Sequence, residues 1–129
     1  MNTTADTTGG ATPNRRILLV DDSVDAALAM GMLLEALGHK VRTEHDGPRA
    51  LASIDEFCPD VVVLDIGLPG MDGFEVAREM RKRDATKHAL MLAMTGYGSD
   101  ADCADALAAG FDHHLTKPVS IDALEALLK

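Results

Sequence analysis

Four short runs rich in Val, Leu, Ile or Met each end in polar residues that can bind phosphate or a metal ion. The runs are ILLVDD (17–22), VVVLD (61–65), LMLAMT (90–95) and HHLTKP (113–118). Strands buried on both faces are typical of a parallel sheet covered by helices. Such sheets bind ligands at the carboxyl ends of their strands. The pattern therefore predicts that one edge of the sheet collects the polar residues that end these runs: Asp21, Asp22, Asp65, Thr95 and Lys117.

Helical segments alternate with strands along the chain. Strands are predicted at 16–20, 40–45, 61–64, 90–94 and 112–116. Helices are predicted at 23–37, from Gly47–Pro48 to about Phe57, and at 74–83, 99–109 and 120–128. Ser23 and Gly38 are start and stop signals for the first helix, and Pro48 suits the first turn of the second. Five strand–helix units with short connections predict an α/β fold with an open, doubly wound sheet.

Length and composition indicate one domain with a polar leading segment. Residues 1–14 offer almost nothing to bury and are predicted to form a disordered tail, which leaves 15–129 as the domain. The net charge of −9 disfavours nucleic acid and anionic membrane surfaces as partners. Because no apolar stretch has bilayer length and Met1 precedes Asn and Thr, we expect a cytoplasmic protein.

Cysteine and histidine positions do not indicate a metal or disulfide scaffold. Cys58 and Cys103 are interpreted as reduced thiols in or near the core. His113 and His114 are adjacent, so on a strand they point to opposite faces and cannot hold one metal together.

The residues that end the runs suit phosphoryl chemistry. Carboxylates are the ligands that Mg²⁺ prefers, and Asp21, Asp22 and Asp65 supply three of them. A carboxylate can also attack phosphorus to give an aspartyl phosphate, and Asp65 is the expected nucleophile. Taken singly, the Asp pair could be a helix cap, Thr95 a strand-end cap, and Lys117 a solvated lysine before a proline turn. Only their joint arrangement favours a site.

The combination of motifs resembles the receiver domain of the two-component response-regulator family over 15–129. The matching segments are LLVDD, VVVLDIGLPGMDGFE, MTGYG and AGFDHHLTKPV. The resemblance implies a flavodoxin-like, doubly wound five-stranded parallel sheet of order 2-1-3-4-5 with five helices. It also implies a phospho-accepting Asp65, with Thr95, Lys117 and the Gly96 N–H around the phosphoryl group.

The same resemblance implies a cofactor, partners and one unusual peptide bond. Mg²⁺, for which Mn²⁺ could substitute, would be held by Asp22, Asp65 and the Gly67 carbonyl, with Asp21 acting directly or through water. A histidine kinase or histidine phosphotransfer protein would donate the phosphoryl group. A downstream protein would bind the face of the fourth helix, fifth strand and last helix. The Lys117–Pro118 bond is expected to be cis.

Some positions depart from the family pattern. Receivers usually carry Tyr or Phe three residues before the lysine, where this chain has His114. His114 is either a half-exposed strand residue or a polar switch group that moves with Thr95, and both interpretations stay open. Gly67 and Tyr97 stand where side chains tune phosphoryl lifetime, with opposite expected effects. The acidic residues Asp100, Asp102 and Asp105 disfavour the dimer typical of DNA-binding regulators.

The leading hypothesis is a signalling switch without an output domain, not an enzyme that turns over an external substrate. A receiver fragment of a hybrid sensor kinase, acting as relay or phosphate sink, is the alternative. A Mg²⁺-dependent phosphatase of the haloacid dehalogenase type is disfavoured, because it needs a second Asp where Gly67 stands. The intact acidic pair, Asp65, Thr95 and Lys117 argue against a degenerate receiver, and a flavin-binding flavodoxin relative is weaker still.

Overall fold

Five parallel strands form the central layer of the structure. A computed structural model describes residues 14–68, 70, 73–96 and 106–128. The strands are β2 (Arg16–Val20), β3 (Lys40–Glu44), β4 (Val61–Asp65), β5 (Leu90–Thr95) and β6 (His113–Thr116). Every neighbouring pair is parallel, and the order is β3-β2-β4-β5-β6. This confirms the predicted 2-1-3-4-5 sheet.

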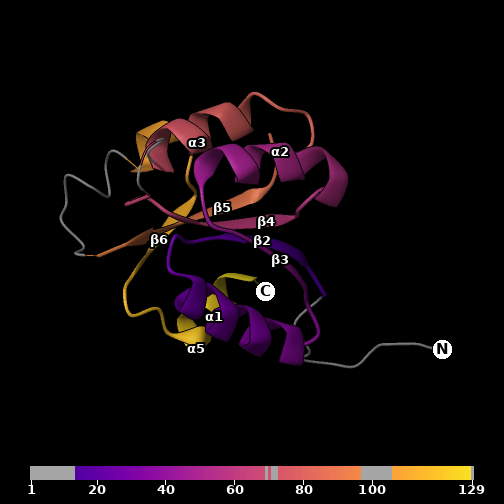
Figure 1. Cartoon of the computed structure of the whole chain (residues 1–129), viewed down its shortest axis with the longest axis vertical. Helices are drawn as coiled ribbons and strands as arrows, with labels where there is room; N and C mark the ends of the chain where they lie inside the picture. Colours follow the sequence, from indigo (N-terminus) through magenta and orange to yellow (C-terminus); the bar gives the residue numbers. More distant parts are fainter. Residues whose placement is uncertain (1–13, 69, 71–72, 97–105, 129) are drawn as a thin grey trace.

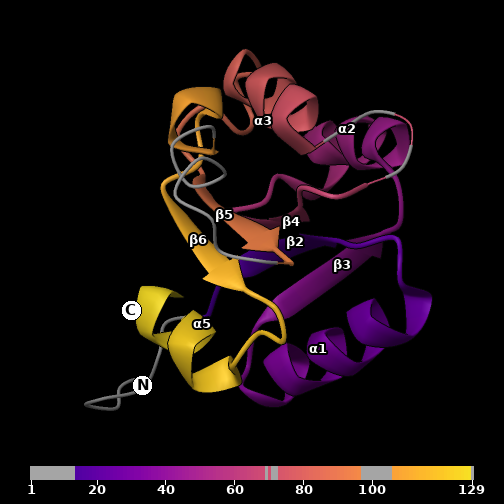
Figure 2. The same ribbon diagram turned by 90° about the vertical axis from the view of Figure 1, so that its left-hand side faces the viewer.

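Helices cover both faces of this sheet. They are α1 (Val24–Ala36), α2 (Gly47–Phe57), α3 (Gly73–Arg81) and α5 (Ile121–Leu128). Residues 106–109 are also helical, and the rest of the predicted 99–109 helix lies outside the described residues. Figures 1 and 2 show α2 and α3 on one side of the sheet and α1 and α5 on the other. None of the helices in the described ranges is both long and apolar enough to cross a membrane.

Strand residues alternate between two apolar cores, one under each helical layer. In β4, Val62 and Leu64 pack with α2 and α3, whereas Val61 and Val63 pack with α1 and α5. All four are fully buried. Because helices cover both faces of this strand, side chains pointing to either face are buried and apolar, which explains the sequence VVVLD.

Capping signals predicted from sequence are present at both ends of α1. The Ser23 side chain accepts a hydrogen bond from the Ala26 N–H, and Gly38 has a φ of +101° just after the helix. In α2, Pro48 lies in the first turn, as predicted, and Asp46 is the N-cap.

Two predictions about local structure are wrong. The third helix ends at Arg81, not at residue 83, because the N–H groups of Lys82 and Arg83 donate to the carbonyls three residues back, in a tighter turn. Cys58 is exposed rather than in or near the core. It occupies the left-handed cap position after α2, with φ 51°, directly before the buried Pro59. Cys103 and residues 1–13 of the predicted tail lie outside the described residues.

His39 is a buried titratable residue that sequence reasoning missed. It is 5% exposed, and its Nδ1 accepts a hydrogen bond from the Arg15 N–H at 3.0 Å. The Arg15 guanidinium donates to the Leu128 carbonyl at the end of α5. Burial lowers the pKa of His39; the Glu125 carboxylate opposes this shift and the Arg15 charge adds to it. Neutral His39 therefore links β2, β3 and α5.

The hydrogen bond between the Arg15 N–H and His39 is expected to weaken in acid. The pKa of His39 is lower in the folded chain than in the unfolded chain, so the unfolded chain takes up the proton first as pH falls. The contribution of neutral His39 to stability is therefore complete above the ordinary pKa of 6.5 and is lost as pH falls toward the folded pKa. Urea unfolding at about pH 7.5 and about pH 5.5 should show a smaller pH-dependent loss for His39→Gln than for wild type. His88→Gln, at an exposed position, is the control and should behave as wild type. Equal losses of unfolding free energy between the two pH values in wild type and His39→Gln would contradict this role of neutral His39.

Candidate functional site

The carboxyl ends of the strands bring the predicted residues together. Asp21 and Asp22 follow β2, Asp65 ends β4, Thr95 ends β5, and Lys117 follows β6. An open cleft of about 550 Å³ lies at this edge of the sheet. Its lining comes from the strand ends and the loops beyond them: Asp22, Asp65, Ile66, Gly67, Phe74, Thr95, Gly96 and Lys117. A site formed by strand ends in this way is expected of a doubly wound sheet.

Three carboxylates form one acidic cluster. Asp21, Asp22 and Asp65 each offer an oxygen, and these oxygens lie within 4.8 Å of one another. Asp21 and Asp65 are each 5% exposed, whereas Asp22 is open to solvent. Burial raises the pKa of Asp21, although the Ser23 N–H and the Lys117 charge oppose the shift. Neighbouring carboxylates repel one another when all are ionised, and a hard divalent cation bound between them would remove that repulsion.

Lys117 is the cation that faces this cluster. Its Nζ donates to Asp65 Oδ2 at 2.6 Å, while its backbone N–H donates to the Thr95 carbonyl at 2.7 Å. Burial alone would lower the pKa of Lys117, but the hydrogen bond to Asp65 and the surrounding carboxylates raise it overall. Lys117 is therefore charged at neutral pH. The Lys117–Pro118 peptide bond is cis, as the motif resemblance implies.

Thr95 supplies a hydroxyl that the described part of the chain leaves unused. The residue is 1% exposed, and its Oγ1 has no hydrogen-bond partner among the described residues. Buried polar groups nearly always have a partner, so this hydroxyl indicates a missing acceptor. Beside it, a Cβ added at Gly96 would meet no atom within 4 Å among the described residues. The strand end therefore offers a donor and open space for an anionic group.

Backbone N–H groups also hold the carboxylates in place. The Gly67 N–H donates to Asp65 Oδ1 at 2.8 Å, and the Ser23 N–H donates to Asp21 Oδ1 at 2.9 Å. Gly73 packs under the same loop, since a Cβ there would lie 2.9 Å from the Asp65 carbonyl oxygen. Sequence reasoning missed this role of Gly73, for which the only signal was the glycine repeat in LPGMDG.

His114, the predicted switch residue, lies on the edge strand of the sheet. His114 is exposed on β6, opposite Ala93 in register, whereas its neighbour Leu115 is buried in the core under α1 and α5. Strand alternation puts His114 on the other face of the sheet, which is also the face of Thr95. That position fits both interpretations of His114. Tyr97 and the acidic residues Asp100, Asp102 and Asp105 lie outside the described residues.

Comparison with known sequences assigns this geometry to one family. A family model for the response regulator receiver domain matches residues 17–129. The transcriptional regulatory protein TrcR of Mycobacterium tuberculosis is 40% identical over 114 residues, which cover 88% of this chain and 44% of that protein. The response regulator PleD of Caulobacter vibrioides is 36% identical over 104 residues, covering 81% of this chain and 23% of PleD. The chain thus spans less than half the length of these relatives.

Solved structures give the same result. The chemotaxis response regulator CheY4 of Vibrio cholerae superimposes with a TM-score of 0.83 at 29% identity, covering 90% of this chain and 97% of CheY4. A co-crystal of the Saccharomyces cerevisiae histidine phosphotransfer protein Ypd1 with the receiver domain of Ssk1 matches with a TM-score of 0.82 at 26% identity. That match covers 91% of this chain and 88% of the other.

Proposed function

We propose that this chain, which belongs to the response regulator receiver domain family, is a two-component signalling switch that accepts a phosphoryl group on Asp65. The observation that carries the proposal is the environment of Asp65. This buried carboxylate faces an open cleft and is held by the Gly67 N–H on one oxygen and by Lys117 on the other. A positioned carboxylate beside a cation and an unused hydroxyl suits in-line phosphoryl transfer.

In the proposed step, a carboxylate oxygen of Asp65 attacks phosphorus. An O–P bond forms while the P–N bond of a phosphohistidine donor breaks, and the electron pair leaves on the imidazole nitrogen. Lys117 transfers its hydrogen bond from Asp65 Oδ2 to a phosphoryl oxygen, since the two acceptors compete for one ammonium. The Thr95 hydroxyl, which has no acceptor in the described chain, donates to another phosphoryl oxygen, and the Gly96 N–H to a third.

The residues present fit a divalent cation. Three carboxylates and one ammonium leave a formal local charge of −2, which one Mg²⁺ balances. Asp22, Asp65 and the Gly67 carbonyl would hold Mg²⁺, with Asp21 acting directly or through water, and Mn²⁺ could replace it. Bound there, the ion would neutralise charge on the phosphoryl oxygens.

The experiment that tests the function uses a small donor. Wild-type chain incubated with acetyl phosphate and Mg²⁺ should gain the mass of one phosphoryl group, whereas Asp65→Asn should gain none. Omitting Mg²⁺ should abolish the gain. A wild-type chain that gains no phosphoryl group, and that also fails to bind beryllofluoride in the presence of Mg²⁺, would overturn the proposal.

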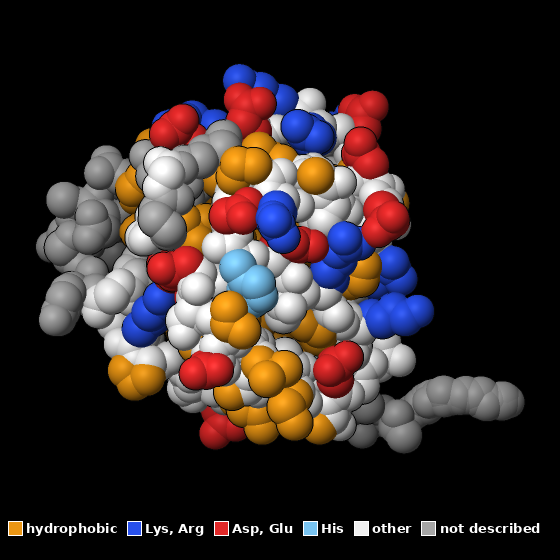
Figure 3. All heavy atoms as spheres, viewed as in Figure 1, with side chains coloured by type: hydrophobic (Ala, Val, Ile, Leu, Met, Phe, Trp, Pro, Cys, Tyr) orange, Lys and Arg blue, Asp and Glu red, His pale blue; other side chains and the backbone are white. Residues whose placement is uncertain are grey.

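The surface of α1 offers a docking face for the donor. Large exposed apolar side chains lie along α1 and at its C-cap: Val24, Leu28, Met32, Leu33 and Leu37. Figure 3 shows hydrophobic side chains gathered at the bottom of the molecule, where Figure 1 places α1. A helix that is apolar well beyond its buried face is expected to meet a partner. Because only Ser23 separates Asp22 from the start of α1, a protein bound there could present its phosphohistidine to Asp65.

A charge on this face should separate donor docking from chemistry. Leu28→Glu should slow transfer from a phosphorylated histidine phosphotransfer protein by about tenfold, because a buried apolar contact at an interface is lost. Phosphorylation by acetyl phosphate should be unchanged, since Leu28 does not line the cleft. Leu107→Glu is the matched control, because Leu107 is 61% exposed and Leu28 is 59% exposed. Equal effects of Leu28→Glu with both donors would contradict docking on α1.

The downstream partner is proposed to bind the face that includes β6 and α5. His114 lies on this face, and the polar-switch interpretation predicts that His114→Phe changes partner binding or its pH profile. The alternative function, a relay receiver in a hybrid sensor kinase, uses the same Asp65 chemistry. A phosphatase stays disfavoured, because the position two residues after Asp65, where such an enzyme needs a second Asp, is Gly67.

A further inference from the structure

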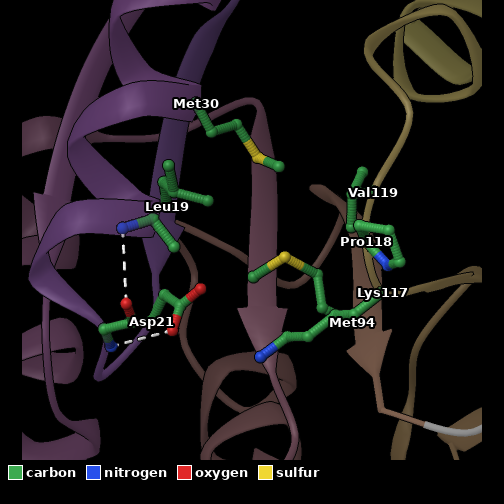
Figure 4. Close-up of a pocket in the computed structure, with 9 residues that line it drawn as sticks. Leu19, Asp21, Met30, Met94, Lys117, Pro118 and Val119 are labelled. Carbon is green, nitrogen blue, oxygen red and sulfur yellow. Dashed lines mark hydrogen bonds between the residues drawn. The ribbon is translucent and has the colours of Figure 1, made fainter.

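A second cavity lies on the other side of Asp21 and Lys117 from the phosphoryl cleft. Its volume is about 440 Å³, within the range of small-molecule sites. It opens between α1 and the segment that joins β6 to α5. The lining comes from both of these and from the strands between them: Leu19, Asp21, Ser23, Ala26, Met30, Met94, Lys117, Pro118 and Val119. In Figure 4 the side chains of Met30 and Met94 extend into the space between α1 and Pro118–Val119.

The walls of this cavity are apolar and adaptable. Leu19 and Met94 form its base from β2 and β5, and each is 1% exposed. Met30 and Ala26 form one side, and Val119 forms the other. Methionine is unbranched and polarisable, so two methionines can adjust to ligands of different shape. Such walls favour a ligand that is mostly hydrocarbon.

The polar end of the cavity carries negative charge. Asp21 and Lys117 converge there, and Lys117 already donates to Asp65 at 2.6 Å. Asp21 belongs to the cluster of three carboxylates. Among the described residues, Lys117 is the one cation that forms an ion pair with this cluster. A ligand end group at Asp21 therefore meets a field that favours a cation and disfavours a carboxylate.

We propose that this cavity is a regulatory site for small apolar ammonium ligands, with the hydrocarbon part between Met30 and Met94 and the ammonium group at Asp21. Because Asp21 also belongs to the acidic cluster, the ligand and Mg²⁺ compete for the same charge. Linkage then requires that Mg²⁺ weakens ligand binding and that the ligand weakens Mg²⁺ binding by the same factor. The site thus gives the chain a chemical input that is separate from donor docking on α1.

A matched ligand series tests the proposal without any phosphorylation. Hexylammonium, 1-hexanol and hexanoate are titrated into the Mg²⁺-free chain while the methyl NMR signals of Met30 and Met94 are followed. Hexylammonium should shift both signals saturably and bind about tenfold or more tightly than hexanoate, because its end group carries the opposite charge on a chain of the same carbon number. Adding Mg²⁺ should weaken hexylammonium binding.

Paired variants of α1 locate the ligand. Ala26→Leu fills the cavity, while Ala29→Leu makes the same change at an exposed position of α1 that does not line it. Ala26→Leu should abolish the saturable shifts, and Ala29→Leu should preserve them. The proposal is overturned if hexanoate binds as well as hexylammonium, if the shifts appear at Met32 on the exposed face instead, or if Ala26→Leu binds normally. Acetyl phosphate labelling of Asp65 tests the proposed function independently of these results.

Discussion

Replacement of Lys117 with methionine is expected to slow phosphorylation by acetyl phosphate by about a hundredfold, the usual effect of removing one preorganised donor to a transition-state oxygen. Methionine keeps an unbranched apolar stem but loses the ammonium that now binds Asp65 Oδ2. The loss acts mainly on the rate, because the ammonium stabilises charge on the transferring phosphoryl group. Quenched time points analysed by intact mass give the rate.

The same variant should bind Mg²⁺ more tightly than wild type. Removing Lys117 leaves the three carboxylates of the acidic cluster without the ammonium that opposes them. A slower reaction together with tighter Mg²⁺ binding, measured by calorimetric titration, distinguishes loss of the ammonium from damage to the fold. Lys82→Met, at an exposed lysine after α3, is the control and should change neither quantity. If Lys117→Met weakens Mg²⁺ binding and slows the reaction together, the assigned role is wrong.

Gly73→Ala should have the largest effect on stability, with a loss of about 2–3 kcal/mol in the free energy of unfolding, typical of steric overpacking. The new Cβ would collide with the Ile66 backbone and lie 2.9 Å from the Asp65 carbonyl oxygen. Backbone atoms cannot move aside as a flexible side chain can. The loop after Asp65 must therefore shift, and phosphorylation should fall along with stability.

Gly31→Ala is the matched control for this change. A Cβ at Gly31, on α1, would lie 3.6 Å from Thr43 Cγ2 and 3.7 Å from Val41 Cγ1, which are ordinary contacts. Alanine in a helix is favoured over glycine by about 0.5–1 kcal/mol, so this variant should be more stable than wild type. Urea unfolding followed by circular dichroism measures both variants. Similar stability changes for Gly73→Ala and Gly31→Ala would contradict the packing argument.

The middle of the sheet could be predicted from sequence because β2, β4 and β5 are buried on both faces, whereas the edge strands β3 and β6 are only partly buried. Val61–Asp65 contains no polar residue before its end, and a run of that kind has few alternatives in a domain of this size. The site followed from the same pattern, since Asp65 and Thr95 end their strands and parallel strands end at one edge. Local signals such as Ser23 and Pro48 then set the helix starts.

Features that depend on distant partners could not be predicted in this way. Arg81 binds the Gly110 carbonyl and Asp112, and nothing near Arg81 in the sequence indicates those contacts. His39 is buried because Arg15 and α5 lie against it, and both are remote along the chain. The cavity beside Asp21 likewise combines α1 with Pro118 and Val119. Such contacts arise only after the chain has folded.

Locating the phosphoryl group on the chain tests the central claim most directly. Wild-type chain phosphorylated with acetyl phosphate and Mg²⁺ would be digested under conditions that preserve acyl phosphates, and the peptides would be fragmented in the mass spectrometer. We predict one modified residue, Asp65, at the end of β4. A phosphoryl group on His113, His114 or any residue other than Asp65 would contradict the account.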